Sequence, residues 1–380
     1  MKVTPLTLEE IKTLVAEYVT QEKLSNPNFI VSRDNVAGLL DKIGKITMLS
    51  QRFVDKLEIL DREFLSYGKT IEEWCQDLTM PMDYDPTGAN ALAPYDPSYR
   101  PPYYSYTLGK KVIPATRRFN DLERAVHNDG ELVELISSIL VNLYNSEKVW
   151  RYSVKREILG KITTLAKETS LENTTADPFD PDAAYSVGTY VYRESETPDP
   201  KDGVFVVFNA IPANTGDTIE DRLASGDVVK LKTIQSISNI TDTATGEAFV
   251  KQLKTDVEIA SDNSQGYSFN GNAVGATEGL VLFVKFGVMP TIDVDVLAGA
   301  FQENRVAVPA EIIPLPDFGK DNDDVIAILM DRRAAGLHPT YRAVREQPNG
   351  LGDFINYFLH SEDTAYISRN AFIKVYVKGE

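Results

Sequence analysis

Residues 128–168 read NDGELVELISSILVNLYNSEKVWRYSVKREILGKITTLAKE and carry a long helical pattern. Asn128 and Glu131 have the spacing of an N-cap residue and its N3 partner. Apolar residues then recur at helical intervals from Leu132 onward. If the pattern is continuous, residues 130–168 form a helix roughly 55–60 Å long, at about 1.5 Å per residue. A sustained heptad repeat is missing, so we expect one long helix that is not part of a coiled coil.

The sequence on the C-terminal side of this helix mixes helix and strand patterns. Four apolar runs predict strands: LVLFVKFG (280–287), DDVIAILMD (323–331), FINYFLH (354–360) and FIKVYV (372–377). Helical periodicity covers residues 246–260, and residues 291–302 are expected to form a short helix. Because helices and sheet elements alternate in mixed order, the predicted class is α+β.

The sequence before the long helix begins with an amphipathic pattern at residues 7–24, where Thr7 and Glu10 have capping-box spacing. The apolar face of this helix either packs within the same subunit or docks on another one. Residues 43–57 favour β structure, and residues 68–78 indicate a short strand or strand end. Residues 107–119, TLGKKVIPATRRF, are expected to form a returning strand.

Residues 81–106 contain six prolines and six tyrosines. The prolines exclude a central strand or a helix, and the tyrosines are too many for a typical disordered linker. This composition is typical of an extended arm that lies on another surface, because a tyrosine ring buries area while its hydroxyl finds a partner. The alternative is a packed surface loop of the same subunit. The expected inter-subunit contacts are Tyr84, Tyr95, Tyr99, Arg100, Tyr103, Tyr104, Lys110 and Lys111, with carboxylates facing the basic residues.

A β pattern returns from Tyr185 to about Leu231, where YSVGTYVYRES and VFVVFNAI flank the turn-rich TPDPKDG. We expect a small separate β module at about residues 178–240. Strand alternation places Val191 opposite Tyr190 and Tyr192, so these two tyrosines are candidate surface aromatics. The alternative is that they fill the core of the module.

The composition limits the possible partners. The net charge is −17, whereas a protein that grips a phosphate backbone or an anionic membrane needs an excess of Lys and Arg. The single cysteine, Cys75, cannot form an internal disulfide, which fits assembly in a reducing cytoplasm. No apolar run approaches the roughly 18–20 residues that span a bilayer, and no signal peptide is expected.

Motifs of catalysis, cofactor binding and metal binding are missing from the sequence. The three histidines stand far apart, and there is no HExxH, CxxC, GxSxG, P-loop or GxGxxG pattern. The acidic residues Asp177, Asp180 and Asp182 lack the glycine and terminal glutamate of an EF-hand loop. The sequence therefore predicts no enzyme activity, no cofactor and no metal site.

Three parts of the chain resemble the major head proteins of small podoviruses of the phi 29 type. They are LLDKIGKITMLSQRF with YGKTIEEWCQDL (39–53 and 67–78), ELISSILVNLYNSEKVWRYSVKREIL (134–159) and TIDVDVLAGAFQENR (291–305). The C-terminal tract ending in YISRNAFIKVYV is compatible with the same family. The resemblance covers about two thirds of the chain, and its specificity comes from the order and spacing of these segments.

The resemblance implies the Hong Kong 97-like capsid fold. Residues 1–42 would form an N-terminal arm, and residues 43–127 a peripheral-domain strand and an extended loop, the loop lying at about 58–113. Residues 128–170 would be the spine helix of the peripheral domain, and residues 244–330 the axial domain. Residues 331–380 would return to the axial and peripheral domains. Residues 171–243, an inserted β module and linker, depart from the family pattern, and we expect the module to project from the outer face.

The implied function is that of a major capsid protein of the virion. It would self-assemble through pentamers and hexamers, in the host bacterial cytoplasm, into the icosahedral head that encloses the dsDNA genome of a tailed bacteriophage. The implied partners are other copies of the chain, scaffolding and portal proteins, and DNA held by enclosure without sequence-specific binding. The alternative is a phage head-decoration or tail component that binds host carbohydrate through the aromatic strands at 185–211.

Overall fold

The computed structural model describes residues 53–66, 68–73, 75–76, 99–100, 105–118, 129–169, 176–194, 201–241, 243–275, 279–288 and 310–379. These residues fall into two compact units. The hairpin unit takes its described residues from Phe53, Val112–Glu147 and Ala343–His360, and the main unit from Val54–Lys111, Lys148–Arg342 and Ser361–Glu380. Within these ranges, no helix is long and apolar enough to cross a membrane.

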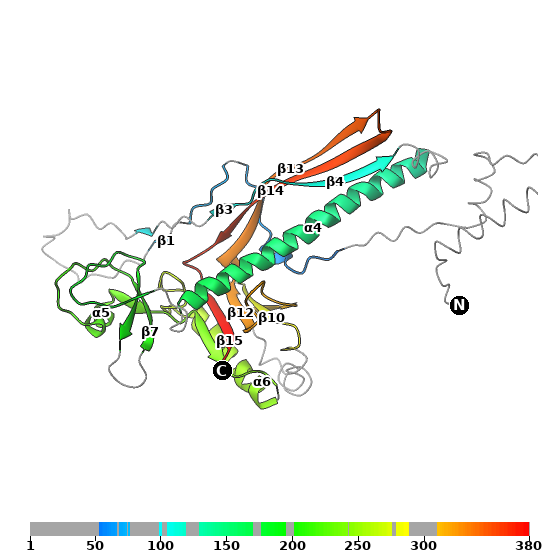
Figure 1. The fold of residues 1–380 in the computed structure, drawn as a ribbon. Coiled ribbons are helices and arrows are strands. Elements are labelled where there is room, and N and C mark those ends of the chain that lie inside the picture. Colours follow the sequence, from blue (N-terminus) through cyan, green and yellow to red (C-terminus); the bar gives the residue numbers. More distant parts are fainter. Residues whose placement is uncertain are drawn as a thin grey trace, which may run out of the picture. The chain divides into compact units, whose positions relative to one another are not determined.

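The predicted long helix is α4, Asp129–Glu168, which Figure 1 shows as one continuous element. The prediction is confirmed, although Asn128 lies outside the described residues. The C-terminal half of α4 belongs to the main unit, and there Leu159, Ile162 and Ala166 are fully buried. The amphipathic pattern of the sequence therefore corresponds to a buried helix face.

The main unit is built on a five-stranded sheet with the order β11-β10-β12-β15-β9. β10 pairs with β11 in parallel and with β12 antiparallel, β12 pairs with β15 antiparallel, and β15 pairs with β9 in parallel. The strands are β9 (Ile234–Ile237), β10 (Leu280–Lys285), β11 (Ala310–Leu315), β12 (Val325–Asp331) and β15 (Ile373–Lys378). The strands expected from the apolar runs at 280–287, 323–331 and 372–377 are confirmed.

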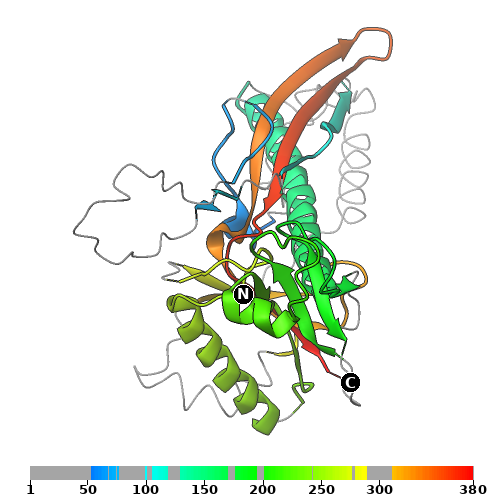
Figure 2. The same ribbon diagram turned by 90° about the vertical axis from the view of Figure 1, so that its left-hand side faces the viewer.

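Both faces of this sheet are buried, which explains the continuous apolar runs of its central strands. Val281 and Phe283 of β10 face a core that also contains the C-terminal half of α4. Leu282 and Val284 face a second core, which includes Phe249 of α6, Thr243–Ser261. The helix expected at 246–260 is thus confirmed as α6 (Figure 2). The mixture of long helices and mixed sheets confirms the α+β class.

The β module forms a four-stranded sheet with the order β5-β6-β7-β8 and a short helix. Its elements are β5 (Asp177–Pro178), β6 (Tyr190–Glu194), β7 (Lys201–Val207), α5 (Ile219–Ser225) and β8 (Val228–Lys230). Val191, Phe205 and Ile219 share a core on the α5 side, and Val204, Val206 and Val229 share another on the opposite face. β9 lies within the expected module range 171–243 but belongs to the five-stranded sheet of the main unit.

β13 (Ala335–Asn349) and β14 (Phe354–Ile367) form a long hairpin, which Figures 1 and 2 show clearly. β14 also pairs with β3 (Ser105–Thr107) and with β4 (Lys111–Arg118), so the strand expected at 107–119 exists as two pieces. In the hairpin unit, Leu143 of α4 shares a small core with Tyr357 and Leu359 of β14. The strand expected at 354–360 is confirmed and extends to Ile367.

Two local predictions were wrong in part, and a third is confirmed only over two residues. Residues 53–57 form no strand, and the 3-10 helix η1 (Glu58–Leu60) follows them, because Leu57 and Leu60 are drawn into the main core. Of the short strand or strand end expected at 68–78, the described residues contain β1, Cys75–Gln76, which pairs with β2, Tyr99–Arg100. Lys201–Gly203, expected in a turn, belong to β7. The predictions for residues 7–24, 291–302 and most of 81–106 lie outside the described residues.

Candidate functional site

The functional residues expected from the sequence centre on the loop at about 58–113, and the structure describes both limbs at its base. We call residues 53–73 and 105–111 the loop base. Of these, residues 54–66, 68–73 and 105–111 are described within the main unit, Phe53 belongs to the hairpin unit, and Tyr67 lies outside the described residues. On the outgoing limb, Leu57 and Leu60 are buried in the main core, and the N–H of Leu60 donates to Leu57 O (3.0 Å). The limb therefore leaves the core from a fixed position.

Backbone hydrogen bonds continue this attachment along β13. The N–H of Arg62 donates to Leu337 O (3.1 Å), and that of Leu65 donates to Pro339 O (3.0 Å). Asp61 and Leu337 form a parallel bridge. His338 Nδ1 lies 2.7 Å from Glu63 O. The outgoing limb thus behaves as a short additional strand beside the start of β13.

The guanidinium of Arg62 joins two backbone segments and the side chain of Tyr366. Its Nη1 donates to Ile59 O (3.0 Å), and its Nη2 donates to Ala335 O (2.9 Å) and to Arg332 O. Its Nε donates to the hydroxyl of Tyr366 (3.0 Å). A guanidinium has five donors in a rigid fork, so one side chain satisfies several carbonyls at once.

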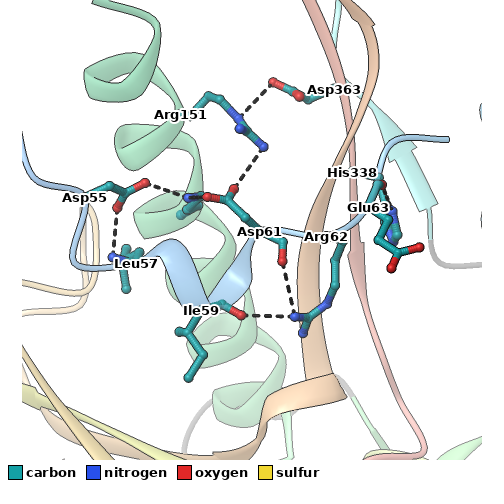
Figure 3. A network of polar contacts seen from close by, with 10 residues as sticks. Asp55, Leu57, Ile59, Asp61, Arg62, Glu63, Arg151, His338 and Asp363 are labelled. Carbon is teal, nitrogen blue, oxygen red and sulfur yellow. Dashed lines mark hydrogen bonds and ion pairs between the residues drawn. The ribbon is translucent and has the colours of Figure 1, made fainter. Parts of the chain in front are cut away.

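A charged cluster holds the same limb against α4 (Figure 3). Lys155 is fully buried, and its Nζ donates to Asp55 Oδ2 and to Asp61 Oδ2, both at 2.6 Å. Arg151 stands one helical turn earlier on the same face. Its Nη2 lies 2.9 Å from Asp61 Oδ1, and its Nε lies 3.6 Å from Asp363 Oδ2. The Arg151 contacts are close ion pairs without the alignment of hydrogen bonds, since neither nitrogen is hydrogen-bonded.

The cluster places two cations among three carboxylates in a poorly hydrated position. Lys155 and Asp363 are fully buried, and Asp55 is nearly so. Removing one partner of such a group leaves a buried charge uncompensated, which costs far more than the loss of a surface pair. The cluster therefore fixes where the outgoing limb leaves α4. Nearby on α4, burial raises the pKa of the Tyr152 hydroxyl, against the opposing charge of Arg156.

The limbs beyond this cluster are attached along β14. Lys69 forms an ion pair with Glu362, and Thr364 Oγ1 donates to Lys69 O (3.1 Å). On the returning limb, β3 pairs with Thr364–Tyr366 of β14, and the N–H of Leu108 donates to Asp363 O (2.8 Å). Both limbs of the predicted loop therefore attach to neighbouring residues of one strand, which is the geometry of a loop with a closed base.

The predicted contact residues fall into three groups. The ammonium of Lys110 lies over the ring of Tyr341, 4.2 Å from its centroid, and Lys111 is exposed at the start of β4. Tyr99 and Arg100 form β2 and pair with Gln76 and Cys75. Outside the described residues lie Tyr84, Tyr95, Tyr103 and Tyr104.

The candidate surface tyrosines of the β module are both half-buried. Tyr190 packs against the core that contains Val206 and Val229, and its hydroxyl donates to Phe269 O (3.1 Å). Phe269 belongs to the loop before β10, so the second face of the module lies against the main unit's own chain. Tyr192 lies on the same strand two residues later.

The sequence did not predict the charged cluster. It also did not predict a second buried polar group, which lies between α6 and β15 of the five-stranded sheet. Asp256 of α6 accepts from Lys374 Nζ and from the Tyr376 hydroxyl, both at 2.6 Å. Burial raises the pKa of Tyr376, and burial lowers the pKa of Lys374 although its bond to Asp256 opposes the change. The only sequence signal for the first cluster is the Arg151–Lys155 spacing on an apolar helix. Its acidic partners are distant in sequence.

Two of the acidic residues near the module contact each other. Asp180 Oδ1 accepts the N–H of Asp182 (3.0 Å), which is a local turn contact. Across the described ranges, no group of three His, Cys, Asp or Glu side chains gathers in a way that would hold a metal ion.

Comparison with known proteins identifies the family. The family model for the Phi29-like phage major capsid protein matches residues 10–375. The chain belongs to this family. Among the relatives of this Phi29-like chain, the major capsid protein of Bacillus phage PZA is 20% identical over 366 residues. That match covers 93% of this chain and 65% of the relative, so the chain spans less than two thirds of the relative's length.

Solved structures show the fold of the Phi29-like chain. The capsid structure of Staphylococcus phage Andhra has a TM-score of 0.57 at 10% identity, covering 89% of this chain and 87% of that one. The capsid structure of cyanophage P-SCSP1u has a TM-score of 0.50 at 11% identity, covering 93% and 99%. The predicted Hong Kong 97-like capsid fold is confirmed. At such low identity the likeness concerns the fold alone.

Proposed function

We propose that this chain is the major capsid protein of a tailed bacteriophage, which self-assembles into the icosahedral head around the dsDNA genome. The observation that carries the proposal is the family match over residues 10–375, and the capsid fold supports it. The protein is then a structural component of the virion and has no enzymatic role.

The loop base supports a specific mode of assembly. Because its two limbs are fixed on β14 and α4, the loop loses less entropy when it contacts a second copy. In this proposal Tyr84, Tyr95, Tyr99, Tyr103 and Tyr104 lie on the α4 helix of a neighbouring subunit, with Arg100, Lys110 and Lys111 near its carboxylates. Three exposed apolar side chains on α4, Val141, Tyr144 and Val149, suit such a contact.

The domain roles follow from the same proposal. Residues 1–42 act as the N-terminal arm, 43–127 carry the extended loop, and 128–170 form the spine. Residues 244–330 make up the axial domain, with residues 331–380 returning to both domains. Residues 171–243 form the inserted module and its linker.

The partners are other copies of the chain, arranged through heterologous, ring-closing contacts into pentamers and hexamers. Scaffolding and portal proteins would join during assembly in the bacterial cytoplasm. A net charge of −17 suits a container that encloses DNA without adhering to it.

Electron microscopy of the purified chain, alone and co-expressed with the scaffolding protein of its phage, tests the proposal. We expect closed shells or capsomer rings. A compact monomer at high concentration under both conditions would contradict it. Trimers that bind host glycans would instead indicate a decoration or tail component.

Deletion of residues 84–102 tests the role of the loop. We expect a folded subunit that forms no closed shells, because the tip is lost while both limbs stay attached. As a control, a glycine-serine segment of the same length in place of residues 84–102 keeps the reach and removes the aromatic side chains. Normal particles from both variants would refute the inter-subunit role of this loop.

A further inference from the structure

The chain contains two Asn-Gly pairs, Asn270–Gly271 and Asn349–Gly350. In such a pair the backbone nitrogen after asparagine has no side chain to shield it, so it can reach the asparagine amide carbon. The two pairs sit in opposite environments, and this difference suggests which one reacts.

Asn349 is the last residue of β13, at the exposed tip of the long hairpin. Its Oδ1 accepts the N–H groups of Leu351 (3.1 Å) and Gly352 (3.0 Å). Two donors on a carbonyl oxygen polarise the carbon and stabilise the oxyanion that forms when a nucleophile attacks. A Cβ at Gly350 would meet no atom within 4 Å, so no neighbouring group crowds this residue on its Cβ side.

We propose that Asn349 is a site of spontaneous deamidation in the folded protein. Water or hydroxide takes the proton of the Gly350 N–H, and the nitrogen forms a bond to Asn349 Cγ. The Cγ–Nδ2 bond then breaks, and ammonia leaves with the transferred proton. The resulting five-membered imide reacts with water at either carbonyl, which gives aspartate or isoaspartate at position 349.

Asn270 has the same local sequence but a protected position. Its Nδ2 donates to Asn370 Oδ1 (2.8 Å), and the N–H of Gly271, which would be the nucleophile, donates to Ser268 O (3.1 Å). Gly271 is buried, and a Cβ there would lie 2.6 Å from Val206 Cγ1. Reaction at Asn270 therefore requires local opening of the fold, which Asn349 does not need.

The product changes the tip of the hairpin. A new carboxylate at position 349 adds to that of Asp353 in the same turn. The side chain of Leu351, between them in the sequence, is fully exposed. The isoaspartate form also lengthens the backbone by one methylene. Each event adds one negative charge to the chain, so the population becomes more acidic with age.

Incubation of the purified full-length protein at mildly alkaline pH tests the proposal. Peptide mass spectrometry follows the amide-to-acid conversion at both sites, and an isoaspartate assay identifies the second product. We expect conversion at Asn349 to exceed that at Asn270 roughly tenfold or more, because the second site must open first. In denaturant, both sites should react at comparable rates.

Two variants complete the test. Gly350→Ala adds a Cβ at an open position, shields the nucleophile and should reduce conversion at Asn349 to the level of Asn270. Asn349→Gln lengthens the side chain, so that cyclisation would need a slower-forming six-membered ring, and should show no isoaspartate there. Equal conversion at the two sites in the folded protein, or unchanged conversion in Gly350→Ala, would overturn the proposal. These readouts do not depend on shell assembly.

Discussion

Lys155 is the residue on which the attachment of the loop base depends most. It is fully buried and donates to Asp55 and Asp61, each at 2.6 Å. Lys155→Met keeps the length of the side chain but leaves both carboxylates without their shared cation. We expect the free energy of unfolding to fall by about 3 kcal/mol, because a buried charge loses its partner. Chemical denaturation of the purified chain measures this loss.

Lys167 provides the matched control on the same helix. Its Nζ lies 2.6 Å from Asp324 Oδ1, but both side chains reach solvent. Lys167→Met should therefore cost less than about 1 kcal/mol, as exposed pairs do. Equal losses in the free energy of unfolding for the two variants would mean that burial does not make the Lys155 ion pairs more important than an exposed pair.

Asp227 of the β module gives a pH-dependent prediction. The Ser225 hydroxyl donates to this carboxylate, and Arg222 and Asn209 also donate; together they lower its pKa below the ordinary value although burial opposes them. The folded-state pKa thus lies below the unfolded-state value of about 3.9. The stabilisation is present above about pH 4 and is lost as the pH falls through the folded-state pKa.

Asp227→Asn should therefore lower the free energy of unfolding by about 0.5–1 kcal/mol at neutral pH, since the carboxylate is partly screened by solvent. The difference from the parent protein should shrink toward zero in acid. Urea unfolding at several pH values measures both quantities. Asp177→Asn, an exposed change in the same module, controls for the loss of a charge, and a constant difference at all pH values would contradict the assignment.

At the scale of elements, Gly160 shows why a helix pattern alone does not specify packing. Glycine within a helix usually costs about 1 kcal/mol relative to alanine. A Cβ at Gly160, however, would lie 2.8 Å from Phe318 O. Gly160→Ala should therefore lower the free energy of unfolding by about 1–3 kcal/mol despite the gain in helix propensity. Ser153→Ala, at an exposed position of α4, should be neutral or slightly stabilising. Greater stability of Gly160→Ala would refute the close contact.

The elements that the sequence predicted well are those with strong periodicity. α4, α6 and the strands β10, β12 and β15 were all visible because their burial produces long apolar patterns. The irregular limb at 53–65 was not predicted, since Leu57 and Leu60 are its only buried residues and two residues give no periodic pattern. The charged cluster was hidden for another reason: Asp55, Asp61 and Asp363 reach α4 only through tertiary structure.

At the scale of the whole molecule, the β module was expected to project as a separate unit. Its contacts with the rest of the main unit argue for closer packing. A Cβ at Gly266 would lie 2.2 Å from Lys230 O, and one at Gly271 would lie 2.6 Å from Val206 Cγ1. Together with the bond from Tyr190 to Phe269 O, these contacts bring the module's second face against the loop before β10. Such close backbone approach is possible only where glycine replaces a side chain.

Gly271→Ala tests whether this contact is needed. Alanine there meets both a positive φ of 72° and the side chains of Val206 and Val229. Gly188→Ala in the same module has a positive φ of 86° but meets no atom within 4 Å. The control should therefore cost about 1 kcal/mol, from backbone strain alone. Gly271→Ala should cost about 2–4 kcal/mol, because overpacking adds to the strain.

Limited proteolysis should also cut residues 176–230 sooner in Gly271→Ala. Equal stability and equal proteolysis of the two variants would favour a module that projects freely, whereas the expected difference makes it an integral part of the subunit.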